Sequence, residues 1–162
     1  MKTLNFIHLD EQKMEKIVDG LQELLANYQV YYTNLRGFHW NVTGKQFFSL
    51  HEKFEELYDD VSTKIDDIAE RILALSGVPK NSFKDYLALS TIEDISSCSC
   101  ADTSVKTVLE NLSVLIGKQK AILAMANEAE DDSTASMMSD YIREQEKLVW
   151  MLVAYFKNCC EA

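Results

Sequence analysis

The sequence QFFSLHEKFEELYDDVSTKIDDIAERILAL, residues 46–75, predicts one long amphipathic helix. Its apolar residues recur at steps of three and four, which is the spacing of a single helix face. They are Leu50, Phe54, Leu57, Val61, Ile65, Ile68, Ile72 and Leu75. A helix of this length with one apolar face is typical of a helical bundle, so this stretch points to an all-α fold.

His51, Glu55, Asp66 and Glu70 share a second face of the same helix. At about 100° per residue, the four side chains fall within a stripe roughly 100° wide. Imidazole and carboxylate groups together suit a divalent transition metal. However, His51 and Asp66 lie roughly 22 Å apart along the helix axis, whereas metal–ligand bonds are only about 2 Å long. One copy of the helix therefore cannot bring both side chains onto one ion.

A second, antiparallel copy of the helix resolves this conflict. Two pairs of these residues share one midpoint in the sequence: His51 with Glu70, and Glu55 with Asp66. Two helices that cross there place His51 opposite Glu70 and Glu55 opposite Asp66, twice over, as in a two-fold dimer. We therefore expect a metal site between subunits. The alternative is that the stripe is only a solvated face or a polar interface.

His39 is a candidate second nitrogen ligand. It lies at the expected C-terminal end of the preceding helix, and Gly44 closes the connection to the helix that carries His51. Trp40 follows His39 directly, and packing alone is sufficient to account for it.

The two ligand-bearing stretches together resemble the signature of the Dps family, the mini-ferritins. The first pattern, His-Trp-x-Val-x-Gly followed by Leu-His and an acidic residue, is matched by His39, Trp40, Val42, Gly44, Leu50, His51 and Glu55. The second is matched by Ile65, Asp66, Ile68, Ala69, Glu70, Arg71, Gly77 and Pro79. The chain departs from the family at Glu55, where Asp is more common, and at Ser76, where Gly, Asp or Asn is usual. Because Glu55 keeps the carboxylate but adds a methylene, we expect a shift of the second metal position.

The resemblance implies a ferroxidase site with up to two irons at each subunit interface. The implied metal ligands come from both subunits of the interface. One subunit supplies His39 and His51, and the others, Glu55, Asp66 and Glu70, come from its two-fold partner or bridge the irons. Glu70 is the best candidate to bridge two irons. His39, His51, Asp66 and Glu70 are the expected catalytic residues. The family oxidises Fe(II), with hydrogen peroxide preferred here over dioxygen, and stores Fe(III) mineral in a hollow dodecamer. The resemblance also places Trp40 beside the metal, where it would absorb stray oxidising equivalents.

The rest of the chain fits one ferritin-like domain over residues 1–162. Helical patterns run from Asp10 to about Phe38, from Asp102 or Thr103 to Met125, and from about Thr134 to Lys157. Residues 80–101 form a long crossover between helices two and three, in which residues 83–89 suggest a short helix. Ferritin bundles place Glu-x-x-His within helices. No histidine of this chain has Glu three residues before it, which again favours a site between subunits.

The formal charge of −10 argues against a nucleic-acid binder, which should carry a basic patch. We expect weak or absent DNA binding, and a DNA-compacting protein with incidental iron binding is the alternative function. A plain helical interaction protein is a further alternative. The sequence shows no apolar run of membrane-spanning length and no signal-peptide pattern, so a cytoplasmic protein is expected.

Two further clusters carry weaker signals. The first is a group of acidic residues: Glu128, Glu130, Asp131 and Asp132. For each residue the preferred interpretation is a solvated loop. The resemblance implies the alternative, that they line an iron-entry pore. Cys98 and Cys100, and the adjacent pair Cys159 and Cys160, match no Cys-x-x-Cys pattern, so we expect reduced thiols.

Overall fold

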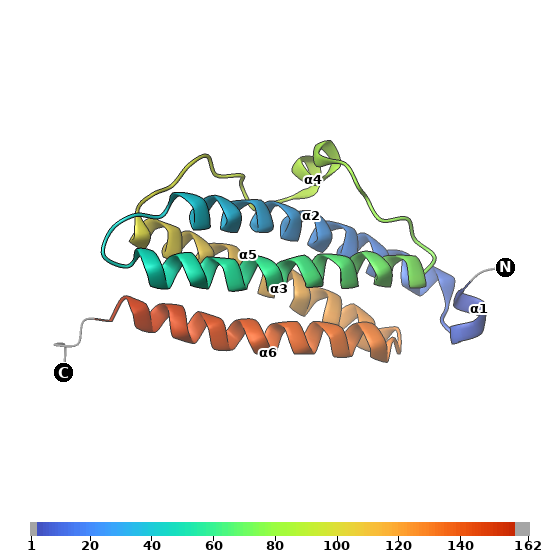
Figure 1. The fold of residues 1–162 in the computed structure, drawn as a ribbon. Coiled ribbons are helices and arrows are strands. Elements are labelled where there is room, and N and C mark those ends of the chain that lie inside the picture. Colours follow the sequence, from blue (N-terminus) through green and yellow to red (C-terminus); the bar gives the residue numbers. More distant parts are fainter. Residues whose placement is uncertain (1–2, 158–162) are drawn as a thin grey trace.

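The computed structural model describes residues 3–157, and this part of the chain contains six helices (Figure 1). They are α1 (Leu4–Ile7), α2 (Glu11–Asn41), α3 (Phe47–Ala74), α4 (Phe83–Leu89), α5 (Ala101–Glu128) and α6 (Asp132–Tyr155). The four long helices form a bundle, and α4 is the short helix of the crossover. The predicted all-α, ferritin-like four-helix bundle is confirmed.

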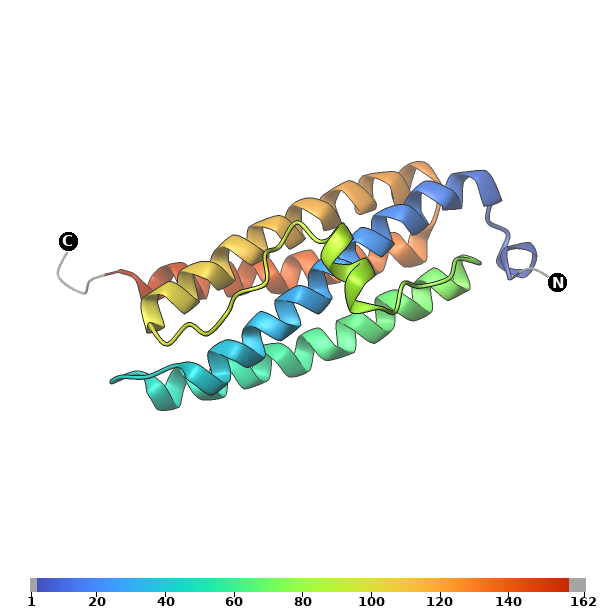
Figure 2. The same cartoon turned by 90° about the horizontal axis from the view of Figure 1, so that it is seen from above.

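The long helices pair in chain order. α2 packs against α3, α5 packs against α6, and α2 also contacts α5. α4 lies on α2, and the rest of the crossover runs back over the α2 and α5 side of the bundle (Figure 2). The end of the crossover is held near the α2–α3 connection, where the Thr43 N–H donates to the Ser99 carbonyl at 3.1 Å.

Two asparagines of α2 hold the crossover in place. The Asn27 Oδ1 accepts the backbone N–H groups of Thr91 and Ile92, both at 3.0 Å. The Asn34 side chain donates to the Glu93 carbonyl and accepts the Ile95 N–H, both at 2.9 Å. Both asparagines are buried, so these bonds satisfy backbone groups that no regular secondary structure pairs.

The predicted helix starts are correct for α2 and late for α5 and α6. The Asp10 carboxylate accepts the Lys13 N–H at 3.0 Å, as expected of a helix cap. α5 begins at Ala101 with Cys100 before it, so the caps Asp102 and Thr103 are wrong. α6 begins at Asp132 rather than near Thr134, because the Asp131 side chain caps it by accepting the Thr134 N–H at 3.1 Å.

Asp131 is not part of a solvated loop. Only 2% of the residue is exposed, and its carboxylate forms an ion pair with the Arg71 guanidinium at 2.5 Å. The Arg71 Nε–H also donates to the Thr134 hydroxyl at 2.8 Å. The acidic turn is therefore fixed to the C-terminal end of α3. Glu128, Glu130 and Asp132 are exposed, and their role in an iron-entry pore stays a prediction.

Lys64 is buried and occupies a position on the otherwise apolar core face of α3. Its ammonium donates to Asp60 at 2.5 Å and to Glu144 of α6 at 2.9 Å. Burial by itself lowers the pKa of Lys64, but the hydrogen bonds and charges of Asp60 and Glu144 outweigh it, so the pKa is raised above its usual value. Lys64 thus remains charged inside the bundle and links α3 to α6.

Candidate metal centre

His39 and His51 lie against each other where α2 ends and α3 begins. Their rings are stacked, with centroids 3.7 Å apart and an interplanar angle of 20°. The Nδ1 atom of His39 lies 2.8 Å from the His51 carbonyl oxygen, and the Nδ1 atom of His51 lies 2.8 Å from the His39 carbonyl oxygen. The structure therefore brings together two of the five predicted ligands.

This reciprocal arrangement fixes the tautomer of both rings. A carbonyl oxygen only accepts hydrogen bonds, so Nδ1 of each histidine must carry the hydrogen. In the neutral imidazole the lone pair is then on Nε2, which is the form that binds a metal ion. Metal-ligating histidines are commonly oriented in this way, through the ring nitrogen that does not bind the metal.

The chain between the histidines makes this register possible. α2 ends with the Val42 N–H donating to the Phe38 carbonyl at 2.9 Å. Gly44 then has a φ of 101°, a conformation that residues with a Cβ atom rarely adopt. Phe47 starts α3, and its ring stacks on His51 with a centroid distance of 5.0 Å. The short connection thereby returns the chain so that residues 39 and 51 meet.

The three carboxylate candidates do not complete a metal-binding group with this pair within the described part of one subunit. Glu55, Asp66 and Glu70 are all on exposed positions of α3. Within residues 3–157 of one chain, no group of three or more His, Cys, Asp or Glu side chains is arranged to hold a metal ion. A single subunit thus supplies parts of a donor set, and the shared site stays a prediction at this point.

Aromatic side chains surround the His39 and His51 pair. The edge of the Tyr58 ring meets His39 at a centroid distance of 5.4 Å, and the Tyr58 hydroxyl donates to the Glu55 carboxylate at 3.3 Å. Partial burial, followed by the negative charges of Glu55 and Asp59, raises the pKa of Tyr58, so the phenol remains a donor at neutral pH. Trp40 is 64% exposed in the single chain and stacks under the Arg36 guanidinium, 4.7 Å from the ring centroid. Trp40 therefore does not serve to fill the core of this subunit.

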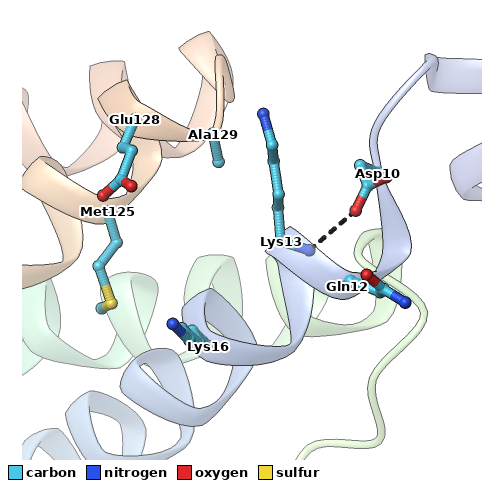
Figure 3. Close-up of a pocket in the computed structure, with 7 residues that line it drawn as sticks. All are labelled: Asp10, Gln12, Lys13, Lys16, Met125, Glu128 and Ala129. Carbon is cyan, nitrogen blue, oxygen red and sulfur yellow. Dashed lines mark hydrogen bonds between the residues drawn. The ribbon is translucent and has the colours of Figure 1, made fainter.

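The described part of the chain also has a surface pocket of about 420 Å³, but it lies far from these residues. It is formed by the N-terminal turns of α2, with Asp10, Lys13 and Lys16, and by Met125 and Glu128 of α5 (Figure 3). Lys13 and His39 are separated by roughly 39 Å along α2. Its lining contains both lysines and carboxylates and none of the five predicted metal ligands, so it is separate from the histidine pair.

Two of the four cysteines lie in the described part of the chain, and neither forms a metal-binding group with the histidines there. Cys98 and Cys100 are free thiols in the crossover, as expected. Cys159 and Cys160 lie outside the described residues.

Among residues 3–157, no helix has both the length and the apolar character that a membrane span requires.

Comparison with known proteins decides the family. A ferritin-like domain model matches residues 18–161. The chain is 47% identical over 154 residues to the DNA protection during starvation protein of Porphyromonas gingivalis, covering 95% of this chain and 97% of that protein. The chain belongs to the Dps family of ferritin-like proteins.

Other Dps proteins agree in both sequence and structure. General stress protein 20U of Bacillus subtilis is 38% identical over 141 residues, covering 87% of this chain and 97% of that protein. The Dps protein of Vibrio cholerae O1 superimposes with a TM-score of 0.91 at 49% identity, covering 92% of this chain and 94% of that one. The Vibrio protein is described as a member of a broad superfamily of ferritin-like diiron-carboxylate proteins.

Proposed function

We propose that this Dps chain oxidises Fe(II) with hydrogen peroxide at sites shared by two subunits, and that it stores the Fe(III) product as mineral inside a hollow dodecamer. The observation that carries the proposal is the His39 and His51 pair, whose backbone hydrogen bonds leave both Nε2 atoms free to bind iron. The diiron-carboxylate description of the Vibrio relative supports the same chemistry.

The proposed site combines two half-sites. One subunit supplies His39 and His51, and the Tyr58 hydroxyl bond favours Glu55 as part of this same half. From the sequence alone, Glu55 was expected to come from the two-fold partner or to bridge the irons. The contacts of Tyr58 with His39 and with Glu55 instead favour placing Glu55 in the same half-site as His39. Asp66 and Glu70 of the two-fold partner complete the donor set, with Glu70 as the bridging carboxylate.

The donor set suits oxidation rather than simple binding. Carboxylate oxygens are hard, anionic ligands that favour Fe(III) over Fe(II), so they draw the reaction forward. Two Fe(II) ions at one site give one electron each to one peroxide molecule. With two protons, the oxygen–oxygen bond breaks and two water molecules form, so no one-electron step releases a hydroxyl radical.

The alternative of a DNA-compacting protein has less support. Non-specific DNA binding requires several Lys or Arg contacts to phosphates. The chain has a net charge of −10, and we propose that protection of the cell by this protein comes from removal of iron and peroxide.

An anaerobic Fe(II) titration followed by stoichiometric peroxide tests this function. We expect about two Fe(II) ions per shared site and rapid oxidation of both by one peroxide. His51→Ala should abolish the fast phase, whereas Glu52→Gln, an exposed neighbour on α3, should leave it unchanged. Peroxide consumption no faster than in buffer would contradict the proposal.

A further inference from the structure

We propose that Tyr58 is a positioning residue that holds the Glu55 carboxylate toward the histidines for metal binding. This inference deepens the proposed function and rests on it. It identifies a side chain that does not itself bind iron but determines how one ligand is presented.

The first contact that supports this role is the hydrogen bond within α3. The Tyr58 hydroxyl donates to Oε1 of Glu55 at 3.3 Å. Residues three positions apart lie on the same helix face, so this bond orients the carboxylate without distorting the helix. It leaves Oε2 of Glu55 to bind a metal ion through a single oxygen.

The second contact fixes the tyrosine itself from α2. The Tyr58 ring meets His39 edge to face, with centroids 5.4 Å apart and an angle of 86°. It meets Tyr32 in the same way, at 6.0 Å and 87°. Because both neighbours belong to α2, the phenol is held between two rings, and its hydroxyl couples Glu55 of α3 to the helix that carries His39.

Glu55 has a particular need for such support. A glutamate side chain has one more rotatable bond than an aspartate, so more conformational freedom is lost when its carboxylate is held in one place. A hydrogen bond from a fixed phenol removes part of that freedom before metal binds. Groups that orient a ligand in this way commonly change metal affinity by about 10- to 100-fold.

Anaerobic titration of the assembled protein with Co(II), which stays divalent in the absence of an oxidant, tests the role of Tyr58. The ring contacts survive in Tyr58→Phe, and the bond of 3.3 Å is long and partly solvated, so we expect about a three- to tenfold loss of Co(II) affinity. Tyr32→Phe removes a hydroxyl from the neighbouring ring and should leave the affinity unchanged. Thermal unfolding should differ little among the three proteins.

A double-mutant comparison separates positioning from a general structural effect. Glu55→Ala should weaken Co(II) binding, and Tyr58→Phe should cause no further loss in that background. An unchanged affinity in Tyr58→Phe, or an equal loss with and without Glu55, would overturn the inference. If the wild-type protein shows no His51-dependent Co(II) binding at all, the proposed function fails together with it.

Discussion

His39 and His51 each donate to a backbone carbonyl of the other residue rather than to its side chain. Truncation of one ring therefore leaves the hydrogen bond of the remaining ring intact. Substitution of one histidine therefore tests its role as a ligand without removing the hydrogen bond that orients the other.

The first prediction concerns these rings individually. His39→Ala and His51→Ala should each lower the rate of peroxide-dependent Fe(II) oxidation by at least about tenfold, because each removes one Nε2 ligand. Stopped-flow absorbance of the ferric product measures the rate. Equal rates for both variants and the wild type would rule out the histidines as ligands.

The second prediction concerns the buried ion pair of Arg71 and Asp131. Arg71→Ala leaves a carboxylate with 1% exposure without its cation, so the free energy of unfolding should fall by about 3 kcal/mol. Arg143→Ala is the matched control, because its pair with Asp140 is exposed, and the change should be no more than about 0.5 kcal/mol. Similar losses in guanidinium denaturation of both variants would contradict this account.

The sequence predicted candidate ligands for a metal, but not how the two histidines among them are held. The spacing of His39 and His51 indicated that both reach one place, and the structure confirms that they meet. Their mutual bonds depend on the path of the backbone through Gly44, which spacing alone does not determine. The sequence did not predict the burial of Lys64, nor that of Asp131, which was expected in a solvated loop. Each forms an ion pair with a distant segment, Lys64 with Glu144 and Asp131 with Arg71.

The long helices were the most predictable elements, because each carries a sustained apolar stripe. α3 spans Phe47–Ala74 against a predicted range of residues 46–75. The starts of α5 and α6 were less predictable. Several polar residues in succession are each able to cap a helix, and only the structure shows that Asp131 is the one whose side chain accepts the Thr134 N–H.

A third prediction concerns two glycines, one in the turn after α3 and one within α5. A Cβ atom on Gly77, after α3, would lie 2.8 Å from Val18 and 2.9 Å from Ile72, so Gly77→Ala should destabilise the fold by about 1–3 kcal/mol. A Cβ atom on Gly117 within α5 meets nothing within 4 Å, so Gly117→Ala should stabilise it by about 0.5–1 kcal/mol. Chemical denaturation gives both values, and the same sign for both variants would contradict the packing described here.

For the whole molecule, three tyrosines in the bundle interior govern stability at alkaline pH. Burial is the main cause that raises the pKa of Tyr28, Tyr31 and Tyr141 above the ordinary value near 10. The unfolded chain therefore loses these protons at a lower pH than the folded chain. Their contribution to stability is complete below about pH 10 and is lost as the pH rises above it.

The fourth prediction is that the free energy of unfolding falls above about pH 10 by about 1.4 kcal/mol per pH unit for each buried phenol. Tyr31→Phe should reduce this slope by one phenol. The same substitution should not lower the free energy of unfolding at neutral pH, because the Tyr31 hydroxyl has no hydrogen-bond partner within the described residues. Guanidinium denaturation between about pH 8 and about pH 11, a range that includes the ordinary tyrosine pKa near 10, measures the slope. An unchanged slope in the variant would contradict the assignment.

The most direct test of the central claim mixes two inactive variants in one assembly. His51→Ala and Glu70→Gln should each be inactive alone, because each removes one half of every shared site. When both subunits are co-expressed in equal amounts and assemble at random, roughly a quarter of the sites receive an intact histidine half from one chain and an intact carboxylate half from another. The measurement is the rate of peroxide-dependent Fe(II) oxidation by this mixed assembly. Recovery to about one quarter of the wild-type rate is the predicted result, and a mixed assembly as inactive as either variant would show that His51 and Glu70 do not complete one site across the subunit interface.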